Sequence, residues 1–278
     1  MARPHPALSF GRPQVFAHRG GAALRPENTL LAFDHGLSLG ADGLELDVHL
    51  SRDGVVVVHH DPTLDRTTSG RGPLAALTAG ELARLDAGYH FGPPMPPEPA
   101  AATATQPTRH PWRGLAGGVP TLADVLQRYP SALFIIELKV NEPILAHRTI
   151  DVVRAADALD RVAVGSFGTR VLRAARAYEP RLVTGASREE TRLALYRSWV
   201  RWPVRRPPNH AFQVPEQSGS TRVVSPRFVR YAHEAGVAVQ VWTVDETADM
   251  QRLLDWGVDG LISDRPDRAV EVVRARTL

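Results

Sequence analysis

The sequence of 278 residues predicts an α/β fold, a single (β/α)8 TIM barrel. Short apolar runs alternate with stretches of helical periodicity along the whole chain, and we count eight such strand–helix units. Eight units over this length favour a closed barrel over an open, doubly wound sheet. The length also suits one large hydrophobic core, so we expect residues 1–278 to form one domain.

The predicted barrel strands are apolar runs bounded by turns or helices. They are residues 14–17, 43–50, 133–139, 162–167, 182–186, 211–214, 237–244 and 260–263. A ninth run, residues 55–59, follows the second strand across Asp53-Gly54, which is a hairpin turn signal. We interpret this run as a hairpin strand appended to the second barrel strand.

Capping residues predict where several helices begin. Ser225-Pro226 supplies an N-cap followed by a proline at the first helical position. Thr121 and Asp124 have the spacing of a capping box. Asp245 is expected to cap the helix that follows the seventh strand.

Residues 65–118 interrupt the alternation of strands and helices. Within them, residues 92–118 are rich in proline, alanine and threonine, a composition that does not bury a core and that predicts a flexible segment. We expect the whole stretch to be an insertion between the second and third barrel strands. Long loops of this kind lie over the catalytic end of a barrel.

The composition excludes several classes of function. The chain has no cysteine, which rules out disulfides, thiolate catalysis and cysteine-ligated metal. Its formal net charge is only +3 and its arginines are scattered, so we expect no nucleic-acid partner. No run approaches the ~18 apolar residues of a membrane span, and residues 1–13 lack the apolar core of a secretory signal. We therefore expect a cytoplasmic protein; the sequence does not predict its oligomeric state.

Acidic side chains occupy one face of two predicted barrel strands. Glu45 and Asp47 alternate with leucines, and because the outward face of a barrel strand must meet helices, the acids should point inward. Glu137 and Lys139 repeat this pattern on the third strand. Three inward carboxylates would make a site for Mg²⁺ or Ca²⁺ rather than zinc. The alternatives are a solvated edge strand for Glu45 and Asp47, and a buried ion pair between Glu137 and Lys139.

Two histidines stand at the ends of predicted strands. His18 ends the first strand and His60 ends the hairpin. Imidazole titrates near neutrality, so one of them can act as a base and the other as an acid in the same turnover. We assign the neighbouring His49 and His59 to structural roles.

A series of short motifs runs in one order from residue 18 to about residue 268. They are His-Arg-Gly at 18–20, Pro-Glu-Asn-Thr at 26–29, Glu-Leu-Asp at 45–47, His-Asp-Pro-Thr-Leu-Asp-Arg-Thr-Thr at 60–68, Val-Pro-Thr-Leu at 119–122, Glu-Leu-Lys at 137–139, Trp-Thr-Val at 242–244, Gly-Val-Asp-Gly at 257–260 and Asp-Arg-Pro at 264–266. Each motif alone is weak, but the ordered set resembles the glycerophosphodiester phosphodiesterase family over nearly the whole chain.

The resemblance implies a (β/α)8 barrel that hydrolyses glycerophosphodiesters to glycerol 3-phosphate and an alcohol, with one divalent ion, Mg²⁺ or Ca²⁺. It also implies roles for eight residues: Glu45, Asp47 and Glu137 as metal ligands, His18 and His60 as the general acid/base pair, Arg19 and Lys139 as phosphate contacts, and Trp242 as an aromatic wall of the substrate pocket. Glu27 is either a supporting residue behind the site or only a first-turn acid of the next helix. Asp245 stands where many family members have asparagine.

Other readings stay open. Residues 192–206 mix Trp199 and Trp202 with arginines, which suits a weak membrane-surface contact and a lysophospholipase D-like enzyme acting on lysophospholipids. The alternative for this segment is an amphipathic barrel helix followed by a proline-containing loop. A barrel that only binds phosphodiesters without catalysis is a further alternative. The nucleophile is either water or the glycerol 2-hydroxyl, and the preferred headgroup is not predicted.

Overall fold

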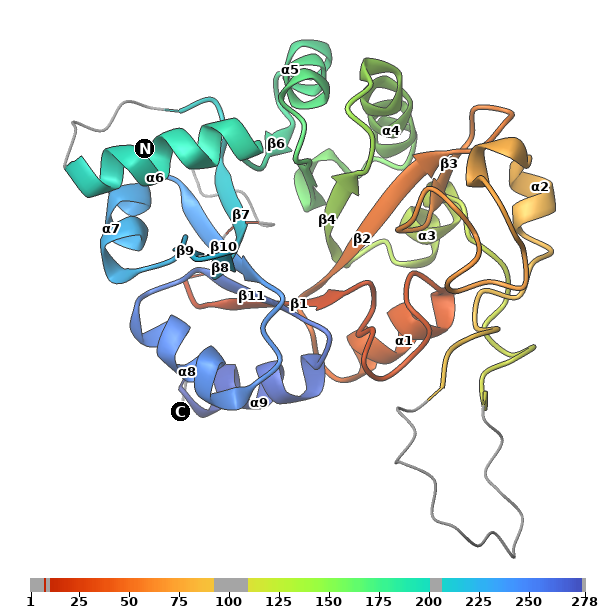
Figure 1. The fold of residues 1–278 in the computed structure, drawn as a ribbon, viewed down its shortest axis with the longest axis horizontal. Coiled ribbons are helices and arrows are strands. Elements are labelled where there is room, and N and C mark those ends of the chain that lie inside the picture. Colours follow the sequence, from red (N-terminus) through yellow and green to blue (C-terminus); the bar gives the residue numbers. More distant parts are fainter. Residues whose placement is uncertain (1–7, 9–10, 93–109, 201–206, 277–278) are drawn as a thin grey trace, which may run out of the picture.

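Eight parallel strands form an almost closed barrel inside a ring of helices in the computed structural model, which describes residues 8, 11–92, 110–200 and 207–276 (Figure 1). The barrel strands are β1 (Gln14–His18), β2 (Gly43–Leu50), β4 (Leu133–Leu138), β5 (Val162–Gly165), β6 (Val183–Thr184), β7 (Ala211–Pro215), β10 (Ala238–Trp242) and β11 (Gly260–Ser263). They are hydrogen-bonded in the order β6-β5-β4-β2-β1-β11-β10-β7, and a parallel bridge between Gly185 and Ala211 links the two ends. The predicted barrel and its eight strands are confirmed.

Helices cover the outside of the barrel, apart from the short α2 and η1, which lie in the segment between β3 (Val56–Val58) and β4. The helices are α1 (Leu30–Ser38), α2 (Ala79–Leu82), α3 (Leu122–Arg128), α4 (Pro143–Ala155), α5 (Thr169–Tyr178), α6 (Arg188–Val200), α7 (Pro226–Glu234), α8 (Thr247–Asp255) and α9 (Pro266–Ala275), with short 3₁₀ turns η1 (Leu74–Ala76) and η2 (Leu159–Arg161). None of the helices in the described part of the chain is both long and apolar enough to span a membrane.

The strand alternation separates an apolar outer face from a mixed inner face. On β2, Leu44 and Leu46 are fully buried in a core that also contains Leu122 of α3 and Leu145 of α4. The residues between them on β2 therefore point into the barrel, as the sequence predicted. The inner layer below the acids is apolar, since Phe16, Leu133, Ile135 and Ile262 pack together there.

The hairpin after β2 is confirmed. Strand β3 (Val56–Val58) pairs antiparallel with β2, with His49 opposite Val57. Gly54 closes the turn with φ +76°, a conformation that favours glycine. The short hairpin formed by β8 (Gln217–Ser218) and β9 (Thr221–Arg222) was not predicted.

The segment between β3 and β4 packs a small core of its own. Leu64, Leu74, Leu82 and Val119 cluster with Val57 of the hairpin. Of the stretch expected to be flexible, residues 93–109 lie outside the described residues, so the flexible insertion stays a proposal. In the described remainder, Trp112 lies against the Arg25 guanidinium at 4.5 Å from the ring centroid.

Two of the three predicted helix caps are confirmed. Ser225 accepts a hydrogen bond from Phe228 N at the start of α7, and Thr121 forms a reciprocal capping box with Asp124 at the start of α3. Asp245 does not cap α8, because Glu246 is the N-cap residue of that helix.

Asp245 instead connects two loops at the carboxyl end of the barrel. Its Oδ1 accepts hydrogen bonds from Ser263 Oγ at 2.9 Å and from Asp264 N at 2.8 Å. Asp245 Oδ1, which the sequence predicted to accept a hydrogen bond from the first turn of α8, accepts one from the backbone N–H of Asp264 instead. This hydrogen bond holds Asp264 in place.

Candidate active site

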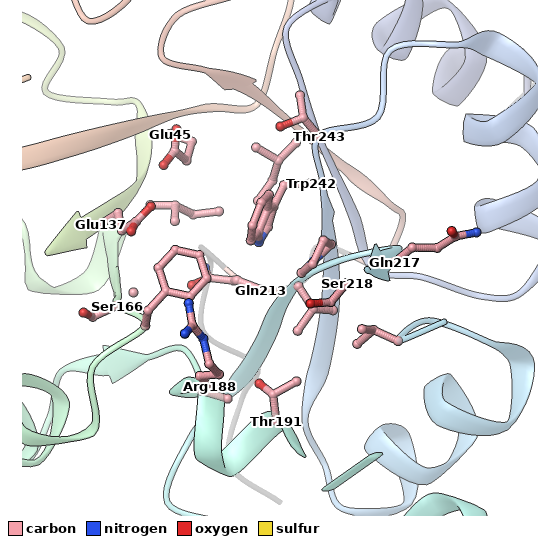
Figure 2. A pocket seen from close by; sticks show the side chains of 18 of the residues that line it. Glu45, Glu137, Ser166, Arg188, Thr191, Gln213, Gln217, Ser218, Trp242 and Thr243 are labelled. Atoms are coloured by element: carbon pink, nitrogen blue, oxygen red, sulfur yellow. The ribbon is translucent and has the colours of Figure 1, made fainter. Parts of the chain in front are cut away.

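Strand register brings the sequence-predicted acids and one histidine together at the carboxyl end of the barrel. His18 of β1 lies opposite Glu45 of β2, and Asp47 of β2 lies opposite Glu137 of β4. One carboxylate oxygen from each of the three acids lies within 4.8 Å of the other two. Figure 2 shows Glu45 and Glu137 at the same end of the pocket.

The three carboxylates are crowded and sheltered from water. Burial and the neighbouring Asp47 raise the pKa of Glu45, and burial raises the pKa of Glu137. Burial would also raise the pKa of Asp47, but Lys139 and Arg19 outweigh it and lower that pKa. Asp47 Oδ1 is buried, and the contact that it makes is ionic, with Lys139 Nζ at 3.3 Å. Three carboxylates with oxygen atoms this close together fit a hard divalent cation such as Mg²⁺ or Ca²⁺.

Lys139 and Arg19 are held among the acids. Lys139 Nζ lies 3.3 Å from Asp47 Oδ1 and 3.2 Å from Glu137 Oε1. Glu137 therefore forms a buried ion pair with Lys139 and also belongs to the carboxylate cluster. The two alternatives that the sequence left open for this strand, an ion pair or a cation site, do not exclude each other. Arg19 Nε lies 3.0 Å from Asp47 Oδ2. Both cations line the pocket next to the acids.

The turn after β1 supplies hydrogen-bond donors to this cluster. Arg19 and Asn28 both adopt a left-handed backbone, with φ +49° and +57°, which is uncommon outside glycine. As a result the Arg19 backbone N–H donates to Glu45 Oε2 at 3.3 Å, and Asn28 Nδ2 donates to Asp47 Oδ2 at 2.9 Å. Glu27 is not in the first turn of α1; it accepts hydrogen bonds from Arg19 and from Arg66. It is a supporting residue behind the site.

His18 is held by a carboxylate on its far nitrogen. Its Nδ1 is 2.6 Å from Asp264 Oδ1, which leaves Nε2 facing the pocket, 3.7 Å from Glu45 Oε2. Burial lowers the pKa of His18, but Glu45 and Asp264 outweigh it and raise the pKa to about 8.

His60 has the same arrangement on the opposite loop. Its Nδ1 is 2.5 Å from Asp61 Oδ1. Burial lowers the pKa of His60, and Asp47 and Asp61 only partly oppose that shift. The two neighbouring histidines form hydrogen bonds with backbone carbonyl groups. His49 Nε2 lies 3.0 Å from the His60 carbonyl oxygen, and His59 Nε2 lies 3.1 Å from the Thr63 carbonyl oxygen.

The pocket above the cluster has a volume of about 980 Å³, within the range of small-molecule sites. Trp242, predicted as an aromatic wall, lines this pocket (Figure 2). The Phe167 ring packs edge-on against it, with 5.8 Å between the ring centroids. Residues of α6 also line the pocket, among them Leu195, Tyr196 and Trp199. All eight sequence-predicted site residues lie in or directly beneath this pocket.

Sequence reasoning missed the residues that hold the histidines. Asp61 and Asp264 lie inside motifs that the sequence displays, but nothing in the motifs says what they contact. Sequence reasoning also did not predict that α6 lines the pocket. The apolar residues of an amphipathic helix have the same spacing whether they pack against the barrel or line a pocket.

Comparison with known proteins decides the family. The family model described as "Glycerophosphoryl diester phosphodiesterase family" matches residues 18–268. The chain belongs to this family. It is therefore a phosphoric diester hydrolase by family membership.

Relatives match over nearly their full length. The glycerophosphodiester phosphodiesterase of Caldanaerobacter subterraneus subsp. tengcongensis is 31% identical over 266 residues, which cover 94% of this chain and 97% of that protein. The crystal structure of a glycerophosphodiester phosphodiesterase from Agrobacterium tumefaciens shares 26% identity with a TM-score of 0.73, covering 95% of this chain and 99% of that one. A phosphodiesterase from Oleispira antarctica, solved with its product sn-glycerol-3-phosphate, shares the fold at 23% identity and a TM-score of 0.71, covering 95% and 97%.

Proposed function

We propose that this family member hydrolyses glycerophosphodiesters to glycerol 3-phosphate and an alcohol, with the help of one Mg²⁺ or Ca²⁺ ion. The observation that carries the proposal is the placement of two carboxylate-backed histidines beside three clustered carboxylates in one pocket. The name of the relative from Caldanaerobacter points to the same substrate class.

Glu45, Asp47 and Glu137 would hold the metal ion, because they supply three hard oxygen ligands from two neighbouring strands. The bound ion would neutralise charge on the phosphodiester as the transition state forms. Arg19 and Lys139 add two fixed positive charges at the pocket floor, and we assign them to the non-bridging phosphate oxygens.

The two histidines divide the proton transfers. His60, whose pKa is lowered, is suited to take a proton from the nucleophile, and His18, whose pKa is raised to about 8, is suited to protonate the leaving alkoxide. A new P–O bond forms to the nucleophile while the P–O bond to the alcohol breaks. With water as nucleophile the products form in one step; with the glycerol 2-hydroxyl a cyclic phosphate forms first and is then opened by water.

Histidine variants test the assignment. His18→Ala and His60→Ala should each lower kcat by at least about 100-fold, and the kcat/KM of the wild type should be bell-shaped in pH. His147→Gln, at a half-buried histidine of α4 stacked on Tyr178, is the matched control and should retain activity. Full activity of both site variants would remove the histidines from the mechanism, and a cyclic phosphate seen by ³¹P NMR would identify the 2-hydroxyl route.

A second candidate substrate is a lysophospholipid, cleaved at the headgroup by the same chemistry. The observation in its favour is that Leu193, Tyr196 and Trp199 of α6 are half exposed, at 50%, 59% and 51%, and that the last two line the pocket. In the segment 192–206 named from the sequence, residues 201–206 lie outside the described residues. A flotation assay with anionic liposomes tests the membrane contact, and absence of co-flotation removes the reason for this candidate.

The remaining expectations belong to the same proposal. We propose a cytoplasmic enzyme with a small-molecule substrate and no nucleic-acid partner. Measurable hydrolysis would exclude the alternative of a barrel that binds phosphodiesters without catalysis.

A further inference from the structure

Arg66 connects two carboxylates that belong to different segments of the site. It lies in the loop after β3, and its Nε donates to Asp61 Oδ2 at 2.6 Å. Its Nη1 and Nη2 donate to the two oxygens of Glu27, in the turn after β1, both at 2.7 Å. The planar guanidinium thus uses one edge for each carboxylate, a geometry that lysine does not provide.

Each of these carboxylates leads to one half of the candidate site. Glu27 Oε1 also accepts from Arg19 Nη1 at 3.0 Å, and Arg19 Nε contacts Asp47 at 3.0 Å. Asp61 contacts His60 Nδ1 at 2.5 Å through its other oxygen. An unbroken chain of ionic contacts therefore runs from the carboxylate cluster through Arg66 to His60.

We infer that Arg66 is a positioning residue, which holds Asp61, and through it the His60 imidazole, at a fixed place relative to the carboxylate cluster. His60 and Asp61 lie on a loop rather than on a barrel strand, so the barrel alone does not fix them. The Asp61 side chain is 22% exposed and would be free to turn into water without Arg66. Arg66 itself touches none of the residues assigned to the reaction, and it does not line the pocket.

Hydrogen bonds also stabilise the charged form of Asp61. Burial would raise the pKa of Asp61, but the bonds from Arg66 and His60 lower it to about 2. An ionised Asp61 accepts a hydrogen bond from the Nδ1–H of His60, which leaves Nε2 free to act as the base.

The test rests on the proposed function and uses glycerol 3-phosphate release by the full chain. Arg66→Ala should lower kcat about 10- to 100-fold, the usual effect of losing a residue that orients a site group, with KM changed less than about threefold. Because the Arg66 side chain is 48% exposed, added guanidinium can reach the vacated position and should restore part of kcat. Arg66→Lys, which keeps the charge without the fork, should stay impaired; wild-type kcat in it would overturn the inference.

A double-mutant cycle separates positioning from a merely structural role. If Arg66 acts through Asp61, the double variant Arg66→Ala/Asp61→Asn should have about the kcat of Asp61→Asn alone. If the two substitutions lower kcat independently, so that the double variant shows the product of the two losses, the inference is overturned. It is also overturned if the loss of kcat in Arg66→Ala accompanies a lower Tm and added guanidinium does not restore it. If Arg66→Ala does not fold, the cycle is run with Arg66→Gln.

The matched control is Arg52→Met, which removes an exposed arginine–glutamate pair on the neighbouring turn, Arg52 to Glu81 at 3.0 Å. It should leave kcat unchanged. A wild-type chain without phosphodiesterase activity would refute the proposed function, whereas an active wild type with a fully active Arg66→Ala variant would refute only the role of Arg66.

Discussion

Asp47 of β2 and Glu137 of β4 lie directly opposite each other in the parallel register, with the Lys139 ammonium within 3.3 Å of both. The backbone thus forces two carboxylates together, and the only lysine of the chain compensates them in part. Glu45, one inward position earlier on β2, is a third carboxylate in the cluster, and its nearest ionisable partner is the His18 imidazole at 3.7 Å. Such crowding costs folding free energy and is typical of a site built to bind a cation.

Removing one of the crowded charges should stabilise the metal-free protein. In EDTA, Glu45→Gln should raise the free energy of unfolding by roughly 1–2 kcal/mol, or Tm by about 3–6 °C, because it removes a buried carboxylate beside Asp47. The same variant should lose most of the stabilisation that Mg²⁺ or Ca²⁺ gives the wild type. Thermal unfolding with EDTA and with each metal measures both effects. A lower Tm in EDTA would show that the carboxylates are not in conflict.

Removing the compensating cation should have the opposite sign. Lys139→Met leaves Asp47 and Glu137 buried without their shared partner, and it should lower the free energy of unfolding by about 3 kcal/mol in EDTA. A divalent ion should restore part of that loss because it replaces the missing charge. Urea unfolding with and without metal measures the difference. Equal stability of Lys139→Met and wild type in EDTA would refute this account of the cluster.

Trp242 should contribute to substrate binding more than to the chemical step. Its ring lines the pocket against Phe167, and the indole carries no group that titrates near neutral pH, so Trp242→Ala should raise KM roughly tenfold and change kcat little. Trp242→Phe, which retains an aromatic face, should lie between. Steady-state kinetics with glycerophosphocholine measure this. A fall in kcat at unchanged KM would instead place Trp242 in the catalytic step.

A pH-dependent contribution to stability should come from His233 of α7. Its Nε2 lies 2.8 Å from Asp259 Oδ2, and this hydrogen bond raises the pKa of His233. The protonated form of His233 is the form that Asp259 stabilises. Its contribution to the free energy of unfolding is therefore complete below the unfolded pKa of about 6.5, and it is lost as pH rises through the raised pKa of the folded state. Because His233 is 43% exposed, His233→Gln should cost less than about 1 kcal/mol near pH 6 and nothing near pH 9. Urea unfolding at both pH values decides it; an equal cost at both would contradict the assignment.

Strand periodicity made the barrel and the carboxylate cluster predictable. The alternation of Glu45 and Asp47 with leucines could be read as inward against outward because a barrel strand has only those two faces. The same alternation put Glu137 on the inner face. Local caps such as Ser225 were predictable for a similar reason, since donor and acceptor lie within one turn.

Contacts between distant loops could not be predicted. Asp264 is 246 residues from its partner His18, and Glu27 is 39 residues from Arg66, so no spacing rule relates them. The prediction that Asp245 caps α8 was wrong for this reason. Its side-chain oxygen accepts a hydrogen bond from the backbone N–H of Asp264, in the loop after β11, and not from the helix. Such choices depend on how the loops meet above the barrel.

The most direct test of the central claim is glycerol 3-phosphate release from glycerophosphocholine, measured first in EDTA and then after Mg²⁺ or Ca²⁺ is added back. The account predicts release that EDTA stops, that one of the two metals restores, and that Glu45→Gln loses under all conditions. Release that continues unchanged in EDTA would contradict the role given to Glu45, Asp47 and Glu137. No release with either metal would move the proposal to the lysophospholipid substrate.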